Sequence, residues 1–217
     1  MPTQGDLTRA IEDFHKARAR ARREQFLAWL RGESSRMICY DEVHEAFGSK
    51  GGRDRGLQDI PLDAVVGSLS RCQDFTRSFL PLRNEDVQRW ARVKLAVEDL
   101  TGLPPIEVYK IGDIYFVLDG NHRVSIARQL GASHIQAYVT EFDIEVPISP
   151  DDQPDDVIIK AEYSQFLQHT HLDEVRPEAD LAVSVPGQYP KLEDHISTHR
   201  YFMGIEAGRE VGYQEAV

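Results

Sequence analysis

The first part of the chain has apolar residues at the spacing of a long helix. From about Asp6 to Arg31, hydrophobic side chains recur every three or four residues, which is the period of an α-helix. Apolar faces of helices are usually buried, so we expect both ends of this helix to pack against the protein. The two apolar groups that should make these contacts are Leu7, Ile11 and Phe14, and then Phe26, Trp29 and Leu30.

An arginine-rich segment lies between the two apolar groups. At about 100° per residue, the four arginines of residues 18–23 spread around the helix and do not form a single stripe. The simpler interpretation is a solvated helix surface. The functional alternative is a basic arm that binds nucleic acid or an acidic partner.

The middle of the chain alternates between segments of helical period and segments of strand period. A helix is predicted from Asn84, its expected N-cap, to Leu100, with Trp90 on its buried face. After it we expect, in order, a strand, a tight turn, a second strand, a helix and a third strand. These segments cover residues 106–110, 112–113, 114–118, 124–130 and 134–142.

Two polar segments divide the chain. Residues 49–56 are rich in glycine and charge, and residues 147–156 are rich in proline and acid, so both are expected to be loops or linkers. The last region is mostly helical and ends without an evident helix cap, so we expect the chain to be part of a longer protein. The predicted division is a helical arm over 1–48, a central domain over 57–143 and an acidic, mostly helical region over 155–217.

The composition is compatible with a packed core, since 41% of the residues are hydrophobic and 28% are charged. No apolar stretch is long enough to span a bilayer and the N-terminus lacks a signal-peptide pattern, so a cytoplasmic location is expected. Cys39 and Cys72 share no metal-type spacing and are expected to be reduced thiols. His195 and His199 have a metal-compatible spacing, but we expect them to be packing residues and predict no metal site.

The net charge of −11 is concentrated towards the C-terminus. Residues 1–37 contain 8 basic and 5 acidic side chains, whereas residues 143–217 contain 5 basic and 16 acidic ones. DNA binding requires clustered Lys and Arg to neutralise phosphates. The chain as a whole therefore does not resemble a simple nucleic-acid-binding protein.

The most informative motif is Asp119-Gly120-Asn121-His122-Arg123, between a predicted strand and a predicted helix. Gly120 permits a tight turn or a close ligand approach, and Asn121 can cap the helix. The free N–H groups and the positive end of the helix dipole then face an anion, which the fork of Arg123 can bind. In the structural alternative, Asp119 and Asn121 only cap the helix, and Arg123 pairs with a surface acid.

The stretch from about Ile60 to Phe142 resembles the ParB/sulfiredoxin superfamily. Ile60-Pro61-Leu62-Asp63 opens it, a polar loop and a helix follow, and Pro105-Ile106-Glu107-Val108 begins a strand pair. The strand pair ends in Asp-Gly-x-His-Arg, and the next helix closes with Leu130-Gly131-Ala132. The resemblance implies an α+β fold with a small mixed sheet and packed helices, here flanked by the long N-terminal helix and the helical C-terminal region.

The branches of this superfamily imply different ligands for the turn. In the ParB branch the turn binds CTP, and in the sulfiredoxin branch it binds ATP and carries a reactive cysteine. Asn121 stands in place of that cysteine, so sulfiredoxin chemistry is not expected. The Asp-Gly-x-His-Arg spelling is closer to a third branch, of kinases that phosphorylate free serine. There a carboxylate in an early loop acts as the base, and Asp74 is the nearest match here.

The resemblance implies roles for individual residues. Asp74 and Asp119 are the candidate catalytic carboxylates, and Asp119 would bind Mg²⁺ or orient a substrate hydroxyl. The ligand would be ATP, ADP or CTP, together with Mg²⁺. The residues expected to bind its phosphates are Gly120, Asn121, His122 and Arg123, with Arg71 and Arg77 completing the pocket.

The leading hypothesis is therefore a nucleotide-binding regulatory or phosphotransfer module, and the sequence leaves open whether it is an enzyme. The alternative is a DNA-associated, ParB-like regulator without catalysis, which would use the arginine-rich helix. The ParB branch usually continues into a helix-turn-helix, and none is recognisable here. A third hypothesis is a scaffold in which the turn survives as a helix cap. A homodimer is compatible with all three, and no membrane partner is expected.

Overall fold

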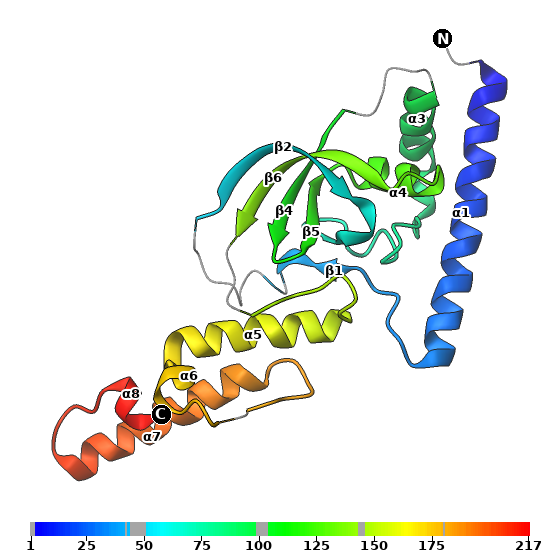
Figure 1. Ribbon diagram of the computed structural model, residues 1–217. Coiled ribbons are helices and arrows are strands. Elements are labelled where there is room, and N and C mark those ends of the chain that lie inside the picture. Colours follow the sequence, from blue (N-terminus) through cyan, green and yellow to red (C-terminus); the bar gives the residue numbers. More distant parts are fainter. Residues whose placement is uncertain (1–2, 42, 44–50, 99–103, 143–145, 180) are drawn as a thin grey trace. The chain divides into compact units, whose positions relative to one another are not determined.

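The structure is a computed structural model that describes residues 3–41, 43, 51–98, 104–142, 146–179 and 181–217 (Figure 1). The described residues of Met1–Asp41, Gly51–Asp143 and Ile148–Pro154 form one compact unit. Those of Glu42–Lys50, Ile144–Pro147 and Asp155–Val217 form a second. The first unit combines a mixed sheet with helices and the second is helical, so the chain has the α+β class that the sequence predicts.

A six-stranded mixed sheet forms the centre of the first unit. Its strands are Ile38–Cys39 (β1), Arg53–Pro61 (β2), Val65–Ser68 (β3), Ile106–Ile111 (β4), Ile114–Asp119 (β5) and His134–Phe142 (β6). The strand order is β1-β3-β5-β4-β6-β2. β5 is parallel to β3 and antiparallel to β4, and β4 is parallel to β6. The predicted strands at 106–110, 114–118 and 134–142 are confirmed as β4, β5 and β6.

The predicted loop at 49–56 is wrong from Arg53 onwards, where β2 begins, and residues 49–50 lie outside the described part of the chain. β2 pairs with β6 at the edge of the sheet, and the pairing is irregular around Gly56, whose φ is 68°. Arg55 forms an ion pair of 2.6 Å with Glu141 of β6. Glycine and charge in this segment therefore belong to a bulged edge strand, a common way to terminate a sheet.

The main hydrophobic core lies between the sheet and the helix α4 (Asn121–Gln129). Val117 of β5 and Val124 of α4 are fully buried in it, and alternate residues of the first part of β6 point inwards. The predicted helix at 124–130 is confirmed, although it begins earlier, at Asn121. The core thus fixes the strand and the helix on either side of the pentapeptide.

The long N-terminal helix is confirmed as α1 (Gln4–Arg31), but only one of its two apolar groups is buried. Thr3 and Asp6 form a reciprocal capping box at its start. The buried ring of Phe14 packs edge-on against Trp90 of α3 (Val87–Glu98) at 5.7 Å, and Figure 1 shows the two helices side by side. The expected packing of the second group is wrong, because these side chains are exposed: Phe26, Trp29 and Leu30.

The expected N-cap at Asn84 is also wrong. Asn84 begins a short 3₁₀ turn, Asn84–Asp86, ahead of α3, and its side chain accepts a hydrogen bond of 2.8 Å from Arg18. Arg18 also donates to the carbonyl of Leu82 at 3.2 Å. Arg18 therefore ties α1 to the segment before α3, and the other arginines of the segment stay exposed: Arg20, Arg22 and Arg23.

Cys39 and Cys72 form a disulfide, so the prediction of two reduced thiols is wrong. Cys39 ends β1, which pairs in parallel with β3, and Cys72 lies shortly after β3. Strand pairing brings the two Cα atoms to 5.2 Å although the residues are 33 positions apart, and the sequence spacing does not reveal this contact. Because disulfides persist in oxidising environments, one reason for expecting a cytoplasmic location is removed.

The second unit is helical, as predicted. Its helices are α5 (Pro154–Thr170), α6 (Leu172–Val175), α7 (Gln188–Ala207) and α8 (Tyr213–Ala216). Phe166, Leu172 and Tyr189 form its core. His169 lies 3.2 Å from Glu193, and within the described ranges no three His, Cys, Asp or Glu side chains gather as metal ligands. Of the helices described, none has the length and apolar character needed to cross a bilayer.

The two aromatic groups of α1 provide a test of this packing. Phe14→Ala should lower the free energy of unfolding by about 3–5 kcal/mol, because it opens a cavity against Trp90. Phe26→Ala, on the exposed part of the same helix, should change it by about 0.5 kcal/mol or less in dilute solution. Urea denaturation of both variants measures the two values, and equal losses would contradict the assignment of buried and exposed faces.

Candidate functional site

The candidate site lies where the neighbouring parallel strands β3 and β5 end. The Ser68 hydroxyl at the end of β3 donates a hydrogen bond of 3.2 Å to the carbonyl of Val117 in β5. The N–H of Leu69 donates to the same oxygen at 3.0 Å. The segment after β3 and the turn after β5 therefore leave the sheet at the same edge. Ligands of sheets with parallel strands usually bind outside this carboxyl edge.

Gly120 makes the sharp turn from β5 into α4. Its φ of 114° and ψ of 19° are readily adopted only by glycine. A Cβ atom at this position would lie 2.4 Å from the side chain of Ile106 and 3.2 Å from the guanidinium carbon of Arg123. Asn121 was expected to cap the helix, but Gly120 occupies the cap position and Asn121 is the first helical residue, which corrects that prediction.

A pocket of about 110 Å³ opens at the N-terminus of α4. It joins the pentapeptide to the segment after β3 and to one face of α3, and its lining includes three arginines and a single acidic residue. The structure thus brings together six of the predicted site residues and adds four others. The lining residues are Ser70, Arg71, Arg89, Val93, Leu118, Asp119, Gly120, Asn121, His122 and Arg123.

Three buried polar atoms of Asn121 and His122, at this helix terminus, lack hydrogen-bond partners among the described residues. Asn121 and His122 are each only 5% exposed. The Oδ1 atom of Asn121 and both ring nitrogens of His122 have no hydrogen-bond partner among the described residues. The first helical bond of α4 runs from the N–H of Val124 to the carbonyl of Gly120, so the N–H groups before it also have no acceptor within the helix. Unsatisfied buried polar atoms at a pocket indicate a place for a polar ligand.

Burial keeps His122 neutral. It lowers the pKa of His122 from 6.5 to about 4, and the opposing attraction of Asp86 is weaker. The ring lies edge-on against Phe75 with the centroids 5.3 Å apart, and its Nε2 is 3.6 Å from Asp86. At neutral pH the imidazole therefore carries one N–H donor and one acceptor.

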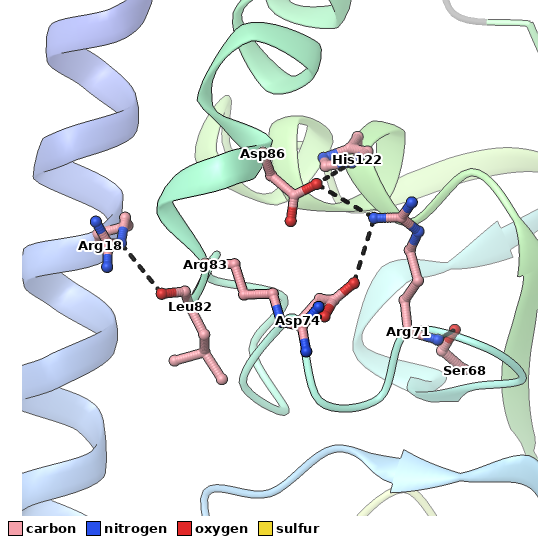
Figure 2. A network of polar contacts seen from close by, with 8 residues as sticks. All are labelled: Arg18, Ser68, Arg71, Asp74, Leu82, Arg83, Asp86 and His122. Atoms are coloured by element: carbon pink, nitrogen blue, oxygen red, sulfur yellow. Dashed lines mark hydrogen bonds and ion pairs between the residues drawn. The ribbon is translucent and has the colours of Figure 1, made fainter.

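Arg71 is held at the pocket by two carboxylates (Figure 2). Its Nη1 atom lies 3.3 Å from Asp74 and 3.2 Å from Asp86, and the same oxygen of Asp86 faces His122. Asp86 thus links Arg71, from the segment after β3, to His122, on α4. The network fixes two pocket residues that lie far apart in the sequence.

Asp74 lies behind the pocket and is not part of its lining. Its side chain is 12% exposed, and the carboxylate accepts from Arg71 on one side and from Arg83, at 2.9 Å, on the other. The carbonyl of Asp74 also accepts a hydrogen bond from the N–H of Leu82. If Asp74 took up a proton, both ion pairs would weaken, so its position favours a role in holding Arg71.

Arg123 is paired even without a ligand. It forms an ion pair with Asp119 one turn away, and it donates to the carbonyls of Pro104 and Pro105 at 2.9 and 2.5 Å. Asp119 is largely exposed at the pocket, whereas Arg123 is half-buried. An anion that binds to Arg123 would therefore have to displace the carboxylate of Asp119 from this ion pair.

Arg77 lies elsewhere. Its guanidinium donates to the carbonyls of Pro150 and Asp152, both at 2.6 Å, and it lines a different pocket that also contains Arg128. These contacts hold part of the predicted linker at 147–156 against the first unit, and α5 begins at Pro154, inside that predicted linker. Of the residues predicted to bind phosphate, Arg77 is the one that lies away from the pentapeptide. Asp74 also lies outside the pocket lining, but it was predicted as a catalytic base and not as a binding residue.

Three polar residues of the site were missed in the sequence. Arg89 is an exposed residue of α3, next to the buried Trp90, and makes no ion pair with any residue that the structure describes. Asp86 precedes it by three positions, and Ser70 precedes Arg71. The sequence does place Arg89 on the polar face of the helix before β4. It does not show that this face of the helix is turned towards the pentapeptide, so Arg89 was not predicted as a site residue.

Comparisons with known proteins found no matching family model and no matching curated protein. Among solved structures, sulfiredoxin from Arabidopsis thaliana is 16% identical, over 40% of this chain and 86% of that protein, with a TM-score of 0.31. The C-terminally truncated chromosome-partitioning protein ParB from Caulobacter crescentus, complexed with CTP-gamma-S, is 14% identical. That match covers 74% of this chain and 71% of that one, with a TM-score of 0.30. At such values the similarity concerns the fold alone.

The buried His122 should make stability depend on pH. Because its pKa is lower in the folded protein than in the unfolded chain, the unfolded chain binds the extra proton below pH 6.5. Between pH 6.5 and about 4, wild-type stability should fall by on the order of 3 kcal/mol relative to His122→Gln. Chemical denaturation at several pH values measures this difference, with His134→Gln at an exposed histidine as the control. Parallel pH profiles for wild type and His122→Gln would contradict the burial of a neutral imidazole.

Proposed function

We propose that the chain binds nucleotide phosphates at the N-terminus of α4 and acts as a regulatory or phosphotransfer module. The observation that carries the proposal is the N-terminus of α4, whose first N–H groups have no acceptor within the helix, beside three arginines that line the same pocket. Phosphate oxygens accept hydrogen bonds from helix N–H groups, from a neutral imidazole and from arginine forks. A phosphorylated ligand thus satisfies the donors of the site, which are the helix N–H groups, the imidazole N–H and the arginine forks, whereas the Oδ1 atom of Asn121 is an acceptor and requires a hydroxyl or a water.

The pocket is small. Its volume of about 110 Å³ is well below the roughly 300–1,000 Å³ typical of sites that enclose a drug-sized molecule. We infer that the phosphate chain enters the pocket and that the nucleoside lies outside it. Recognition would then depend more on the number of phosphates than on the base, so ATP, ADP and CTP are all retained as candidate ligands.

A Mg²⁺ ion fits this arrangement to a limited extent. Magnesium is usually held by one or two carboxylates together with phosphate oxygens and water, and Asp119 is the carboxylate that lines the pocket. Asp119 would therefore bind the ion that accompanies the nucleotide. The ion would neutralise charge on the phosphates.

Nucleotide binding should raise the melting temperature. A ligand that binds only the folded state stabilises it in proportion to the logarithm of its concentration over Kd. ATP, ADP or CTP with Mg²⁺ should therefore shift the thermal transition upwards by several degrees at saturating concentration. Differential scanning fluorimetry across the three nucleotides measures this shift, and its absence with all of them would overturn the proposal.

Arg89 offers a variant with a matched control. Arg89→Ala should reduce the nucleotide-induced shift strongly and leave the melting temperature without ligand unchanged, because Arg89 makes no ion pair within the described residues. Arg92→Ala removes the same charge from an exposed arginine of α3 that does not line the pocket. If both variants lose the shift equally, general charge attraction explains it instead of the pocket.

Phosphotransfer to free serine is the catalytic form of the proposal. The terminal phosphoryl group would move from the nucleotide to the serine hydroxyl, whose proton leaves to a base. Asp119→Asn should lower phosphoserine formation by about tenfold or more, since Asp119 faces the pocket. Asp74→Asn should have the smaller effect, through displacement of Arg71. Chromatographic detection of phosphoserine measures both rates, and no product from the wild-type chain would leave only the regulatory form.

The DNA-associated alternative has less support. Arg20, Arg22 and Arg23 are exposed on α1, which is the observation in its favour. Arg18, however, is used inside the first unit. Four large apolar side chains are also exposed near these arginines. Protein surfaces that bind DNA are usually polar and strongly positive, so an apolar surface of this kind is atypical of them.

A further inference from the structure

The last two turns of α1 carry four large apolar side chains on the surface. Phe26, Leu27, Trp29 and Leu30 are 58%, 48%, 73% and 59% exposed. Single exposed apolar residues are ordinary, but a contiguous group of two leucines and two large aromatic rings is typical of an interaction site. The rings of Phe26 and Trp29 also contact one another, with centroids 6.0 Å apart.

This apolar group faces away from the first unit. The buried face of α1 is formed by Ala10, Phe14, Ala17 and Ala21. At about 100° per residue, Phe26 and Leu30 point to the opposite side of the helix from that face. The C-terminal part of α1 also runs on past α3 (Figure 1).

We propose that this apolar group is the contact surface with a second copy of the chain, formed by two antiparallel α1 helices. A twofold axis at the level of Ala28 places Phe26 opposite Leu30 of the second copy. Leu27 and Trp29 lie on the two flanks of that contact, because they are about 160° apart around the helix. The pairing is self-complementary, as a twofold interface requires.

Charge agrees with the same register. The same axis also brings Arg23 of each copy level with Glu33 of the other copy, so the interface contains two such pairs of opposite charge. Glu33 is held just beyond the helix end, because its N–H donates to the carbonyl of Ala28 at 2.9 Å after the left-handed Gly32. Its existing ion pair with Arg31 is long, at 4.0 Å, and both side chains are more than half exposed, so it is weak.

The oligomeric state of the full chain tests the proposal. Sedimentation equilibrium should show a monomer–dimer equilibrium, and Trp29→Glu should raise the dimer dissociation constant by roughly tenfold or more, as expected for a large aromatic side chain packed against Phe26 at the contact. Leu57→Glu makes the same kind of change at a leucine of β2 that is 51% exposed, and it should leave the equilibrium unchanged. A wild-type chain that stays monomeric at all concentrations, or a dimer insensitive to Trp29→Glu, would overturn the proposal.

A charge exchange distinguishes a second copy from any other occupant. Arg23→Glu and Glu33→Arg should each weaken self-association, because each places like charges opposite one another. An equimolar mixture of the two variants should associate more tightly than either alone, since both cross-copy pairs are then of opposite sign. A mixture no tighter than the single variants would reject the antiparallel register. Binding of monomer to vesicles of anionic lipid, lost in Trp29→Glu, would instead assign the surface to a membrane.

Discussion

The parallel pairing of β3 with β5 is the constraint on which the candidate site depends. It brings the segment that carries Arg71 next to the turn that carries Gly120, although the two are nearly fifty positions apart in the sequence. Ser68 and the backbone of Leu69 fasten the end of β3 to one carbonyl of β5, that of Val117. The Cys39–Cys72 disulfide adds a covalent tie between β1 and the same segment. Without this pairing, the helix terminus of α4 would face solvent with only its own arginine.

The charges of the site are arranged in two layers. In the inner layer, Asp74 and Asp86 fix Arg71, and Asp86 also faces the buried imidazole of His122. In the outer layer, Arg89 and the Arg123–Asp119 pair are open to an incoming ligand. The inner carboxylates compensate buried positive charge and keep its geometry, while the outer cations supply attraction. This division explains why Asp74, although close in sequence to the predicted site, lies behind it.

The sequence predicted the elements better than the contacts between them. Periodicity located α1, β4, β5, α4 and β6, because each buries one face and so leaves a regular pattern. Periodicity did not predict that Phe26 and Trp29 are exposed, because an apolar helix face gives the same period whether or not another part of the protein covers it. The pentapeptide and Arg71 were found from local chemistry and resemblance. Arg89, Asp86 and the Cys39–Cys72 bond depend on how α3 and β1 pack and pair, which local sequence does not encode.

The Asp119–Arg123 pair has a consequence for selectivity among anions. Asp119 is a carboxylate tethered one helical turn from the cation that it neutralises, and so it competes with any free anion at a high effective concentration. A small monoanion that offers a single contact gains too little to displace it. A polyanion that reaches Arg71, Arg89 and the helix terminus together gains several contacts for the one it replaces. Under the proposed function, Asp119 would therefore favour polyanions over simple anions at this pocket.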